Sequence, residues 1–146
     1  MISIRPATAA DRDAAVGIWE ACGLTRPWND PFADFQRALD HVASTVIVAE
    51  QDARIVGTVM TGFDGHRGWI YYLGVAPDRR GRSAARQLLE SACDWLRLCD
   101  CPKVELMLRA GNPAEQFYEH LGWERQDVHV FGRWLDRAPI GGEPPL

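Results

Sequence analysis

The spacing of hydrophobic positions changes several times along the chain, and each change marks the boundary of a predicted element. Apolar residues that recur every three or four positions predict helices with one buried face, over residues 9–21, from residue 31 onward, and over residues 82–98 and 113–120. Concentrations of Val, Ile and Thr predict strands over residues 45–50 and 54–61, and an aromatic and branched stretch predicts one over residues 69–75. Further strands are expected over residues 2–5 and 103–109, and two more within 123–135.

The order of these elements predicts how the sheet is arranged. Residues 45–75 hold three consecutive strands separated by short turns, which favours an antiparallel meander. The helix over 82–98 joins two strands, and such a crossover places residues 69–75 and 103–109 parallel to each other. We therefore expect an α/β (α+β) fold with a mixed central sheet of about seven strands and about four helices.

Length and composition fit one compact domain. The chain has 146 residues, of which 47% are apolar, and this is enough to bury one continuous core. We expect a single domain over residues 1–146, with a flexible tail at 138–146 where proline and glycine are frequent.

Charge, cysteine spacing and hydropathy argue against several classes of function. A formal net charge of -4 argues against a nucleic-acid-binding protein, which needs a basic face. The cysteines, Cys22, Cys93, Cys99 and Cys101, lack the paired spacing or nearby histidines of a zinc site, so we expect no metal. Neither a bilayer-spanning apolar run nor a signal-peptide pattern is present. We expect a soluble, cytoplasmic protein with no membrane partner.

One turn gathers the only dense basic cluster. Three arginines lie within Arg79–Arg82, around Gly81, at the start of a predicted helix. The N-terminus of a helix attracts phosphate because it presents unpaired backbone N–H groups and the positive end of the helix dipole. Gly81 and the small residues Ser83–Ala85 leave room for a phosphate to approach these groups. The alternative is a solvated turn before an amphipathic helix.

This turn resembles motif A of the GNAT superfamily of N-acetyltransferases, in which a strand leads through an R-x-x-G-x-G/A turn into a helix. The matching stretch is Arg80-Gly81-Arg82-Ser83-Ala84-Ala85, and Ser83 stands where the family usually has glycine. The order of predicted elements over residues 2–135 is also that of the family. Three further stretches, Arg26–Pro31, Asp64–Gly68 and Tyr71–Val75, look like those of the YpeA-type bacterial acetyltransferases.

The resemblance implies that acetyl-CoA is the co-substrate and that this turn binds its pyrophosphate. It also implies that the two parallel strands splay apart, and that the pantetheine arm adds to the free strand edge near Leu73, Gly74 and Val75. Family members commonly place an asparagine seven residues before a tyrosine discussed below, and here Asn112 lies six residues before it. Asn112 either contacts coenzyme A or caps the helix that follows.

Tyr118 is the residue that the resemblance assigns to the leaving thiolate. The stretch Phe117–Trp123 resembles a family motif whose tyrosine lies near the sulfur of coenzyme A. A tyrosine with an unshifted pKa of about 10 is a weaker acid than an alkyl thiol with a pKa of about 8.5, so we expect Tyr118 to hydrogen-bond the thiolate rather than protonate it. The alternative is a tyrosine that only packs.

The acceptor amine must lose a proton before it attacks, and the sequence leaves the base open. Many family members carry a glutamate on or near the first parallel strand, but residues 69–75 contain no carboxylate. We take Glu105, on the neighbouring strand, as the candidate base. Asp64 and His66, and Tyr71 or Tyr72 acting through water, are alternatives, and each is also explained as a surface or packing residue.

The loop between the first two helices borders the acceptor site in the family. Here the loop holds Trp28, which can stack on a substrate, and Asn29 and Asp30, which can hydrogen-bond a substrate or attract an ammonium group. These three residues and Tyr71 are the expected substrate-binding residues. Asp30 is also explained as the cap of the helix that starts at Pro31.

We therefore expect an N-acetyltransferase that moves the acetyl group of acetyl-CoA to a primary amine by direct attack. The acceptor is either a small-molecule amine or a peptide, through a protein N-terminus or a lysine. The oligomeric state stays open, and a homodimer is compatible with the sequence. The alternative function is a catalytically silent acyl-CoA-binding sensor or interaction module, which the missing strand carboxylate motivates.

Overall fold

The computed structural model describes residues 1–81 and 83–137, and the chain divides into two compact units, Met1–Met107 and Leu108–Leu146. The first unit contains β1 (Ser3–Pro6), η1 (Ala9–Asp11), α1 (Arg12–Ala21), α2 (Pro31–Asp40), β2 (Ser44–Gln51), β3 (Arg54–Phe63), β4 (Gly68–Val75), η2 (Pro77–Arg79), α3 (Ala84–Leu98) and β5 (Val104–Leu106). The second unit contains α4 (Ala114–His120). The tail predicted to be flexible, residues 138–146, lies outside the described residues.

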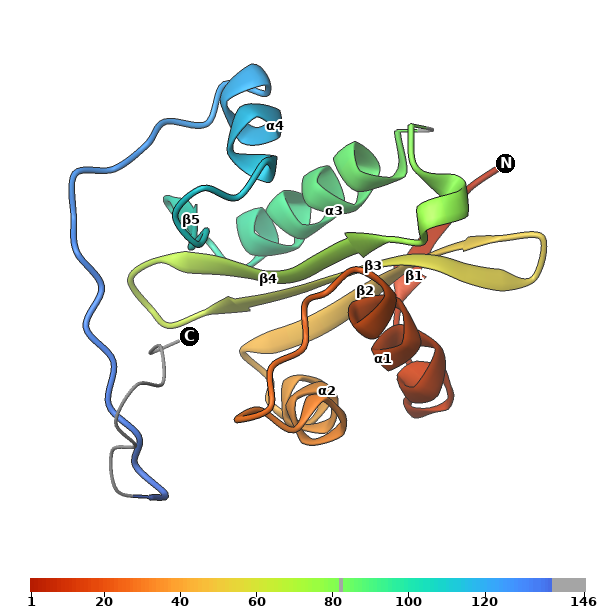
Figure 1. Cartoon of the computed structure of the whole chain (residues 1–146), viewed down its shortest axis with the longest axis horizontal. Helices are drawn as coiled ribbons and strands as arrows, with labels where there is room; N and C mark the ends of the chain where they lie inside the picture. Colours follow the sequence, from red (N-terminus) through yellow and green to blue (C-terminus); the bar gives the residue numbers. More distant parts are fainter. Residues whose placement is uncertain (82, 138–146) are drawn as a thin grey trace. The chain divides into compact units, whose positions relative to one another are not determined.

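The strands of the first unit form one sheet, in the order β1-β2-β3-β4-β5 (Figure 1). β1 to β4 pair antiparallel with their neighbours, as expected for a meander. β5 pairs parallel with β4, as expected for a crossover through α3. The mixed sheet and the four predicted helices are confirmed.

The prediction of about seven strands was wrong, because the sheet has five. The described residues 123–137 contain no strand, and Val128, Val130 and Phe131 in this stretch are exposed. A stretch of strand-forming residues indicates side chains that suit a pleated, half-buried surface. It forms a strand only where a neighbouring strand supplies hydrogen bonds, and the pattern does not identify that neighbour.

One face of the sheet is covered by α1 and α2 (Figure 1). Trp19 of α1 and Phe35 of α2 are fully buried, and their rings lie 6.2 Å apart. They form one core cluster with Val16, Val46 and Val48. Burying an aromatic side chain of this size supplies several kcal/mol, so this pair anchors the two helices on the sheet.

The other face of the sheet is covered by α3 (Figure 1). Two strand glycines allow this helix to approach closely. A Cβ atom on Gly57 would lie 2.8 Å from Cδ1 of Leu88, and one on Gly68 would lie 2.7 Å from Cδ1 of Leu96. Because Leu88 and Leu96 are buried at these points, α3 rests on the backbone of β3 and β4.

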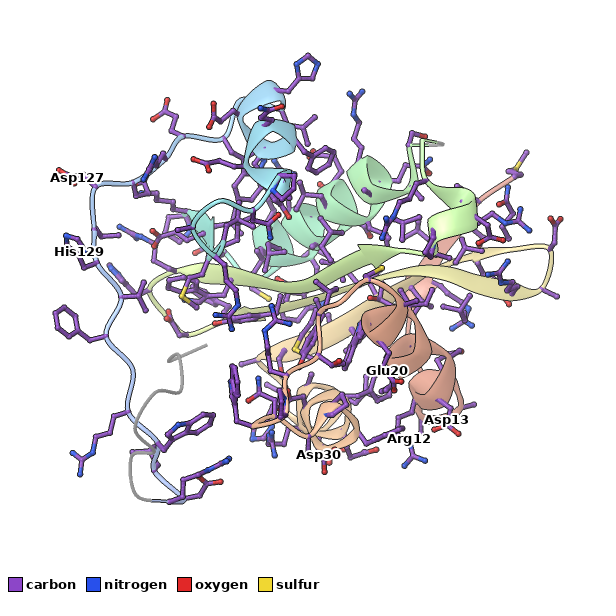
Figure 2. All side chains as sticks on the ribbon, in the orientation of Figure 1. Arg12, Asp13, Glu20, Asp30, Asp127 and His129 are labelled. Atoms are coloured by element: carbon purple, nitrogen blue, oxygen red, sulfur yellow. The ribbon has the colours of Figure 1, made fainter. Side chains whose placement is uncertain are left out.

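Two helix starts follow the capping rules that the sequence suggested. Thr8 and Asp11 form a reciprocal capping box at η1, in which the backbone N–H of Thr8 donates to Oδ2 of Asp11 at 2.8 Å. Asp30 caps α2, because its Oδ1 accepts hydrogen bonds from the N–H groups of Phe32 and Ala33 (Figure 2). The cap explanation of Asp30 is therefore confirmed.

Aromatic contacts and ion pairs occur within the second unit. The ring of Tyr118 on α4 meets the rings of Phe117 and Trp123 edge to face, at 5.2 and 5.6 Å. Arg125 and Glu115 form an exposed ion pair at 3.5 Å. Further along, Asp127 and His129 project from the extended segment (Figure 2).

Residues 1–81 and 83–137 lack two features, a membrane-spanning helix and a metal-binding cluster. None of their helices has the length and apolar character required to cross a membrane. They contain no cluster of His, Cys, Asp and Glu side chains that could hold a metal ion. The four cysteines are free and partly buried.

Candidate functional site

The second half of β4 has a free backbone edge. β5 pairs with β4 only where Val104–Leu106 lies beside Gly68–Ile70. β4 continues to Val75 with β3 on one side, and within the described residues no strand pairs with Tyr71–Val75 on the other. The expected pantetheine-binding residues, Leu73, Gly74 and Val75, lie on this edge.

β4 is also irregular at this place. Thr58 of β3 pairs with Gly74 and Met60 pairs with Tyr71, so Tyr72 and Leu73 together oppose Val59. Two residues against one make a β-bulge, which redirects the backbone locally. Tyr72 has a φ of 51°, a left-handed conformation that bulky residues rarely adopt.

Three contacts hold Tyr72 in this conformation. Its ring stacks on the indole of Trp19 with the ring centroids 3.8 Å apart and the planes inclined by 11°. Its hydroxyl donates to Oδ2 of Asp34 at 2.7 Å, and its carbonyl accepts from Oγ1 of Thr58 at 2.9 Å. The Thr58 hydroxyl in turn accepts from Nε1 of Trp19 at 2.8 Å. Burial and the hydrogen bond to Asp34 raise the pKa of Tyr72.

The direction of the Tyr72 carbonyl fixes the direction of the next N–H. The described peptide bonds are all trans, and in a planar trans peptide the C=O and the following N–H point in opposite directions. The Tyr72 carbonyl points at Thr58 on β3. The N–H of Leu73 therefore points away from Thr58, on the side where β5 has already ended.

The turn after β4 provides a second group of backbone donors. Gly81 has a φ of 80°, which glycine adopts without strain, and a Cβ atom placed on it would meet nothing within 4 Å. In α3 the first intrahelical hydrogen bond runs from Gln87 N–H to the Ser83 carbonyl at 3.1 Å. Within the described residues, the N–H groups of Ala84, Ala85 and Arg86 therefore have no intrahelical acceptor.

Ser83, which stands where the resemblance led us to expect glycine, has a left-handed backbone. Its φ is 63° and its ψ is 8°, a left-handed conformation that costs a residue with a Cβ atom about 1 kcal/mol or more. Its hydroxyl accepts a hydrogen bond from Nε2 of Gln87 at 3.0 Å. Arg82, the other expected phosphate ligand in this turn, lies outside the described residues.

The two described arginines of the turn have different partners. Arg79 donates to Oε1 of Gln51 at 2.9 Å and lies near the carboxylates of Asp52 and Asp78. The charge of Arg79 is therefore paired with carboxylates of the fold. Arg80 has no carboxylate partner among the described residues, and its Nε donates to the Val75 carbonyl at 3.2 Å.

Cys22, at the end of α1, completes this contact. Its thiol donates to the same Val75 carbonyl at 3.3 Å, and its sulfur accepts from Nη2 of Arg80 at 3.4 Å. The Val75 carbonyl is thus satisfied twice. This role of Cys22 could not be predicted, because nothing in the cysteine spacing connects Cys22 to a strand residue 53 positions away.

The expected acceptor residues all lie in the first unit. Trp28 and Asn29 precede α2 and are partly buried, and Asp30 caps that helix. The ring of Tyr71 is 41% exposed, on the bulged half of β4. Burial, with a smaller effect from the charge of Asp64, raises the pKa of Tyr71.

The candidate bases Glu105 and Asp64 differ in how many hydrogen bonds their carboxylate oxygens already accept. Glu105 pairs in register with Trp69, and its carboxylate lies 3.6 Å from Nε of Arg67. Asp64 accepts from the backbone N–H groups of Arg67 and His66 and from Nε1 of Trp69. These bonds lower the pKa of Asp64, so it is a poor proton acceptor.

Tyr118 and Asn112 belong to the second unit. Tyr118 is buried, and burial raises the pKa of Tyr118 to about 12. The Oδ1 atom of Asn112 accepts from the N–H of Ala114 at 2.8 Å, at the start of α4. This bond supports the capping explanation of Asn112 and leaves its amide N–H groups for another partner.

An open pocket of about 470 Å³ lies elsewhere on the first unit. It is lined by one face of α1, by the end of the β2–β3 hairpin and by the residues after β4, including Gly17, Ile55 and Pro77. Arg54, on its wall, is already paired with Asp78 at 2.9 Å. The pocket contains none of the expected site residues.

Comparison with known proteins agrees with this geometry. Residues 8–123 match the model of the acetyltransferase (GNAT) family. The chain is 46% identical over 126 residues to an acetyltransferase of Pectobacterium atrosepticum, covering 86% of this chain and 89% of that protein. It is 44% identical over 135 residues to an acetyltransferase of Yersinia enterocolitica, covering 92% and 96%.

Solved structures with low sequence identity share the fold. The aminoglycoside N-acetyltransferase AAC(6')-Iy, in complex with a bisubstrate analogue of coenzyme A and acetylneamine, has a TM-score of 0.80 at 17% identity, over 92% of this chain and 98% of that one. An acetyltransferase of Clostridium acetobutylicum with acetyl-CoA has a TM-score of 0.75 at 19% identity, over 94% and 99%.

The tyrosines give a testable dependence of stability on pH. The pKa of each of the three tyrosines, Tyr71, Tyr72 and Tyr118, is raised in the folded chain. A raised pKa contributes stability that is complete below the unfolded value of about 10 and is lost as the pH rises above it. We expect the folded chain at pH 10.5 to show less tyrosinate absorbance than the urea-unfolded chain, and a lower urea midpoint than at pH 8.

Tyr118→Phe provides the control for this measurement. It should remove part of the absorbance difference, because it removes one of the shifted groups. Equal tyrosinate absorbance in the folded and unfolded chains at pH 10.5 would contradict the raised pKa values.

Proposed function

Because this chain belongs to the acetyltransferase (GNAT) family, we propose that it transfers the acetyl group of acetyl-CoA to a primary amine that attacks the thioester directly. Family membership confirms the prediction of an acetyl-CoA-dependent acetyltransferase. The amine acceptor and the direct attack are our proposal. The observation that carries it is the free, bulged edge of β4, which leads directly into the amide-rich start of α3.

The pyrophosphate of acetyl-CoA binds at the start of α3 in this proposal. Backbone N–H groups at Ala84 and Ala85 lack intrahelical acceptors, and Gly81 leaves open space beside them. Arg80, which has no carboxylate partner among the described residues, supplies charge, and Ser83 and Arg82 are the other proposed ligands in this turn. A preformed set of amides suits an anion because it needs little reorganisation on binding.

The pantetheine arm adds to the free edge of β4 at Leu73, Gly74 and Val75, as an extended peptide adds to a sheet edge. Arg80 and Cys22 occupy the Val75 carbonyl. When Arg80 turns toward the pyrophosphate, it frees one of the two acceptor positions of this carbonyl for the pantetheine arm, while Cys22 keeps the other. The two halves of the cofactor site are therefore linked through one side chain, and Asn112 can contribute its amide N–H groups.

The N–H of Leu73 stabilises the negative charge that develops on the thioester oxygen. It points away from β3 because the Tyr72 carbonyl points toward Thr58. A backbone donor fixed before the reaction is worth about 100- to 1,000-fold in rate in other acyl transfers. The β-bulge is thus the part of the fold that supplies the transition-state contact.

Tyr118 hydrogen-bonds the thiolate that leaves. Its pKa of about 12 keeps the phenol neutral at pH 7, so it donates a hydrogen bond without giving up its proton. A phenol with a pKa this high protonates a thiolate even less readily than an unshifted tyrosine would.

Glu105 serves as the general base. Holding a lysine-like amine neutral at pH 7 costs about 4.6 kcal/mol, so a proton acceptor or a water wire is required. Among the described residues the Glu105 carboxylate has one ion-pair partner, Nε of Arg67 at 3.6 Å, which lies beyond hydrogen-bond distance and leaves the carboxylate oxygens available to accept a proton. Because Asp64 is committed to three donors and Tyr72 to Asp34, they are weaker candidates.

The acceptor amine binds beside Trp28, Asn29, Asp30 and Tyr71. The exposed ring of Tyr71 and the loop before α2 both lie in the first unit. The acetylneamine portion of the analogue bound to the similar aminoglycoside enzyme supports an amine as the class of acceptor. Both a small-molecule amine and a peptide amine fit the proposal.

Release of free coenzyme A thiol tests the function. The chain is incubated with acetyl-CoA and a panel that contains polyamines, aminoglycosides, amino acids and peptides with free N-termini or lysines. We expect thiol release that depends on one class of amine, with the acetylated product found by mass spectrometry. Tight binding of acetyl-CoA with no turnover across the panel would contradict the proposal and support the catalytically silent sensor.

Tyr118→Phe tests the role of the phenol. We expect kcat to fall by roughly 10- to 1,000-fold with coenzyme A affinity nearly unchanged, the usual range for one acid-base partner. The variant keeps the ring that packs on Phe117 and Trp123, so the thermal unfolding midpoint controls for folding. An unaltered kcat would remove Tyr118 from the mechanism.

Gly81→Val tests the pyrophosphate site. We expect coenzyme A affinity, measured by calorimetry, to fall at least about tenfold, because the side chain enters the anion site and the left-handed backbone is strained. Gly65→Val is the matched control, because Gly65 has a φ of 90° and equally open surroundings in a turn without the expected phosphate ligands. Equal losses in both variants would show that strain alone is responsible.

A further inference from the structure

We infer that Tyr72 is a positioning residue for the acetyl transfer, and that Trp19, Thr58 and Asp34 hold it in place. This inference rests on the proposed function, because its effect acts through the Leu73 N–H. Tyr72 itself does not need to touch the substrates. It sets the direction of the backbone that does.

The backbone of Tyr72 is strained. A φ of 51° in an aromatic residue is unfavourable in isolation and persists only where the surrounding structure imposes it. Neither of the usual residues for this conformation, glycine or asparagine, stands at this position. The contacts of Tyr72 must therefore compensate for the strain.

The compensating contacts come from three different elements. Trp19 of α1 stacks on the ring at 3.8 Å, Asp34 of α2 accepts from the hydroxyl at 2.7 Å, and Thr58 of β3 donates to the carbonyl at 2.9 Å. Trp19 and Thr58 are fully buried. The bond between Trp19 and Thr58 is thus protected from water, which strengthens it, whereas the bonds of Tyr72 to Thr58 and Asp34 are partly buried.

The Thr58 hydroxyl is the centre of this network. It accepts from Nε1 of Trp19 and donates to the carbonyl of Tyr72, so its orientation is fixed at both ends. Without this donor the peptide between Tyr72 and Leu73 has no partner that holds its carbonyl toward β3. The Leu73 N–H then loses its fixed direction.

Loss of the bulge would also change the register of β4. Tyr72 and Leu73 share one position opposite Val59, and Gly74 follows in register with Thr58. A regular strand would shift the residues on one side of the bulge by one position, and a shift of one residue turns every side chain to the opposite face. Gly74 now faces Cys22 and Leu24, where a Cβ atom would lie 3.1 Å from either side chain. The packing of α1 therefore resists this shift.

The network also connects the expected acceptor loop to the bulge. Asp34 lies one turn into α2, the helix that Asp30 caps. Trp28 and Asn29 come directly before Asp30. Its carboxylate is shared between the Tyr72 hydroxyl and Arg37. An acceptor that displaces the start of α2 would move Asp34 and change the hold on Tyr72.

Two substitutions of Thr58 separate positioning from stability. Thr58→Val keeps the side-chain volume and removes the hydroxyl, whereas Thr58→Ser keeps the hydroxyl and removes a methyl group. We expect Thr58→Val to lower kcat by about tenfold with the KM for acetyl-CoA unchanged, the effect of losing roughly one oriented hydrogen bond in the transition state. Thr58→Ser should retain the wild-type kcat, although its lost packing lowers the thermal unfolding midpoint.

Thr61→Val is the matched control on the same strand. Thr61 is 1% exposed, and its hydroxyl has no hydrogen-bond partner within the described residues. We expect its kcat to equal that of the wild type. If kcat follows the unfolding midpoint across the three variants, or if Thr58→Val keeps the wild-type kcat, Thr58 and Tyr72 have only a structural role and the inference fails.

A measurement without turnover separates this inference from the proposed function. Hydrogen exchange and the ¹⁵N chemical shift of the Leu73 amide are recorded for wild type, Thr58→Val and Thr61→Val. We expect Thr58→Val alone to change both quantities at Leu73. A wild-type chain that acetylates no amine would contradict the proposed function, whereas an unchanged Leu73 amide in Thr58→Val would contradict the positioning role.

Discussion

The stacking of Trp19 on Tyr72 is the interaction on which the rest of this fold depends. It joins the centre of α1 to the irregular half of β4, and the same indole packs against Phe35 of α2. The ring contact thus fixes both helices on one face of the sheet and holds a strained backbone in place. Large aromatic surfaces carry much of the energy of a small core, so one pair can serve both purposes.

The charges around the turn after β4 are also determined by contacts within the fold. Arg79 is committed to Gln51 and to carboxylates, and Arg80 rests on a strand carbonyl. In our proposal the anion site therefore depends first on backbone amides at the start of α3, and the charge of the described arginines is secondary. This explains how a chain with a net charge of -4 can bind an anionic co-substrate in our proposal.

Features determined by local sequence were predicted well. The cap at Asp30, the helices and the parallel pairing of β4 with β5 follow from residue types at fixed spacing and from the handedness of crossovers. The bulge was not predicted, because it depends on contacts between residues 38 and 39 positions apart. Asp34 and Thr58 resemble any surface acid and any strand threonine until the fold brings them to Tyr72.

The expected strands within 123–135 and the serine at position 83 could not be interpreted fully from the sequence, for different physical reasons. The expected strands within 123–135 need a partner that alternation alone cannot supply, and the described residues there form none. The substitution of Ser83 for glycine was visible in the sequence, but its meaning required the observed φ of 63°. Glycine would adopt this conformation without strain, and the serine retains the turn at the expense of some strain. In our proposal the tightness of the anion site is therefore set by the backbone, and the side chain at position 83 has a smaller part in it.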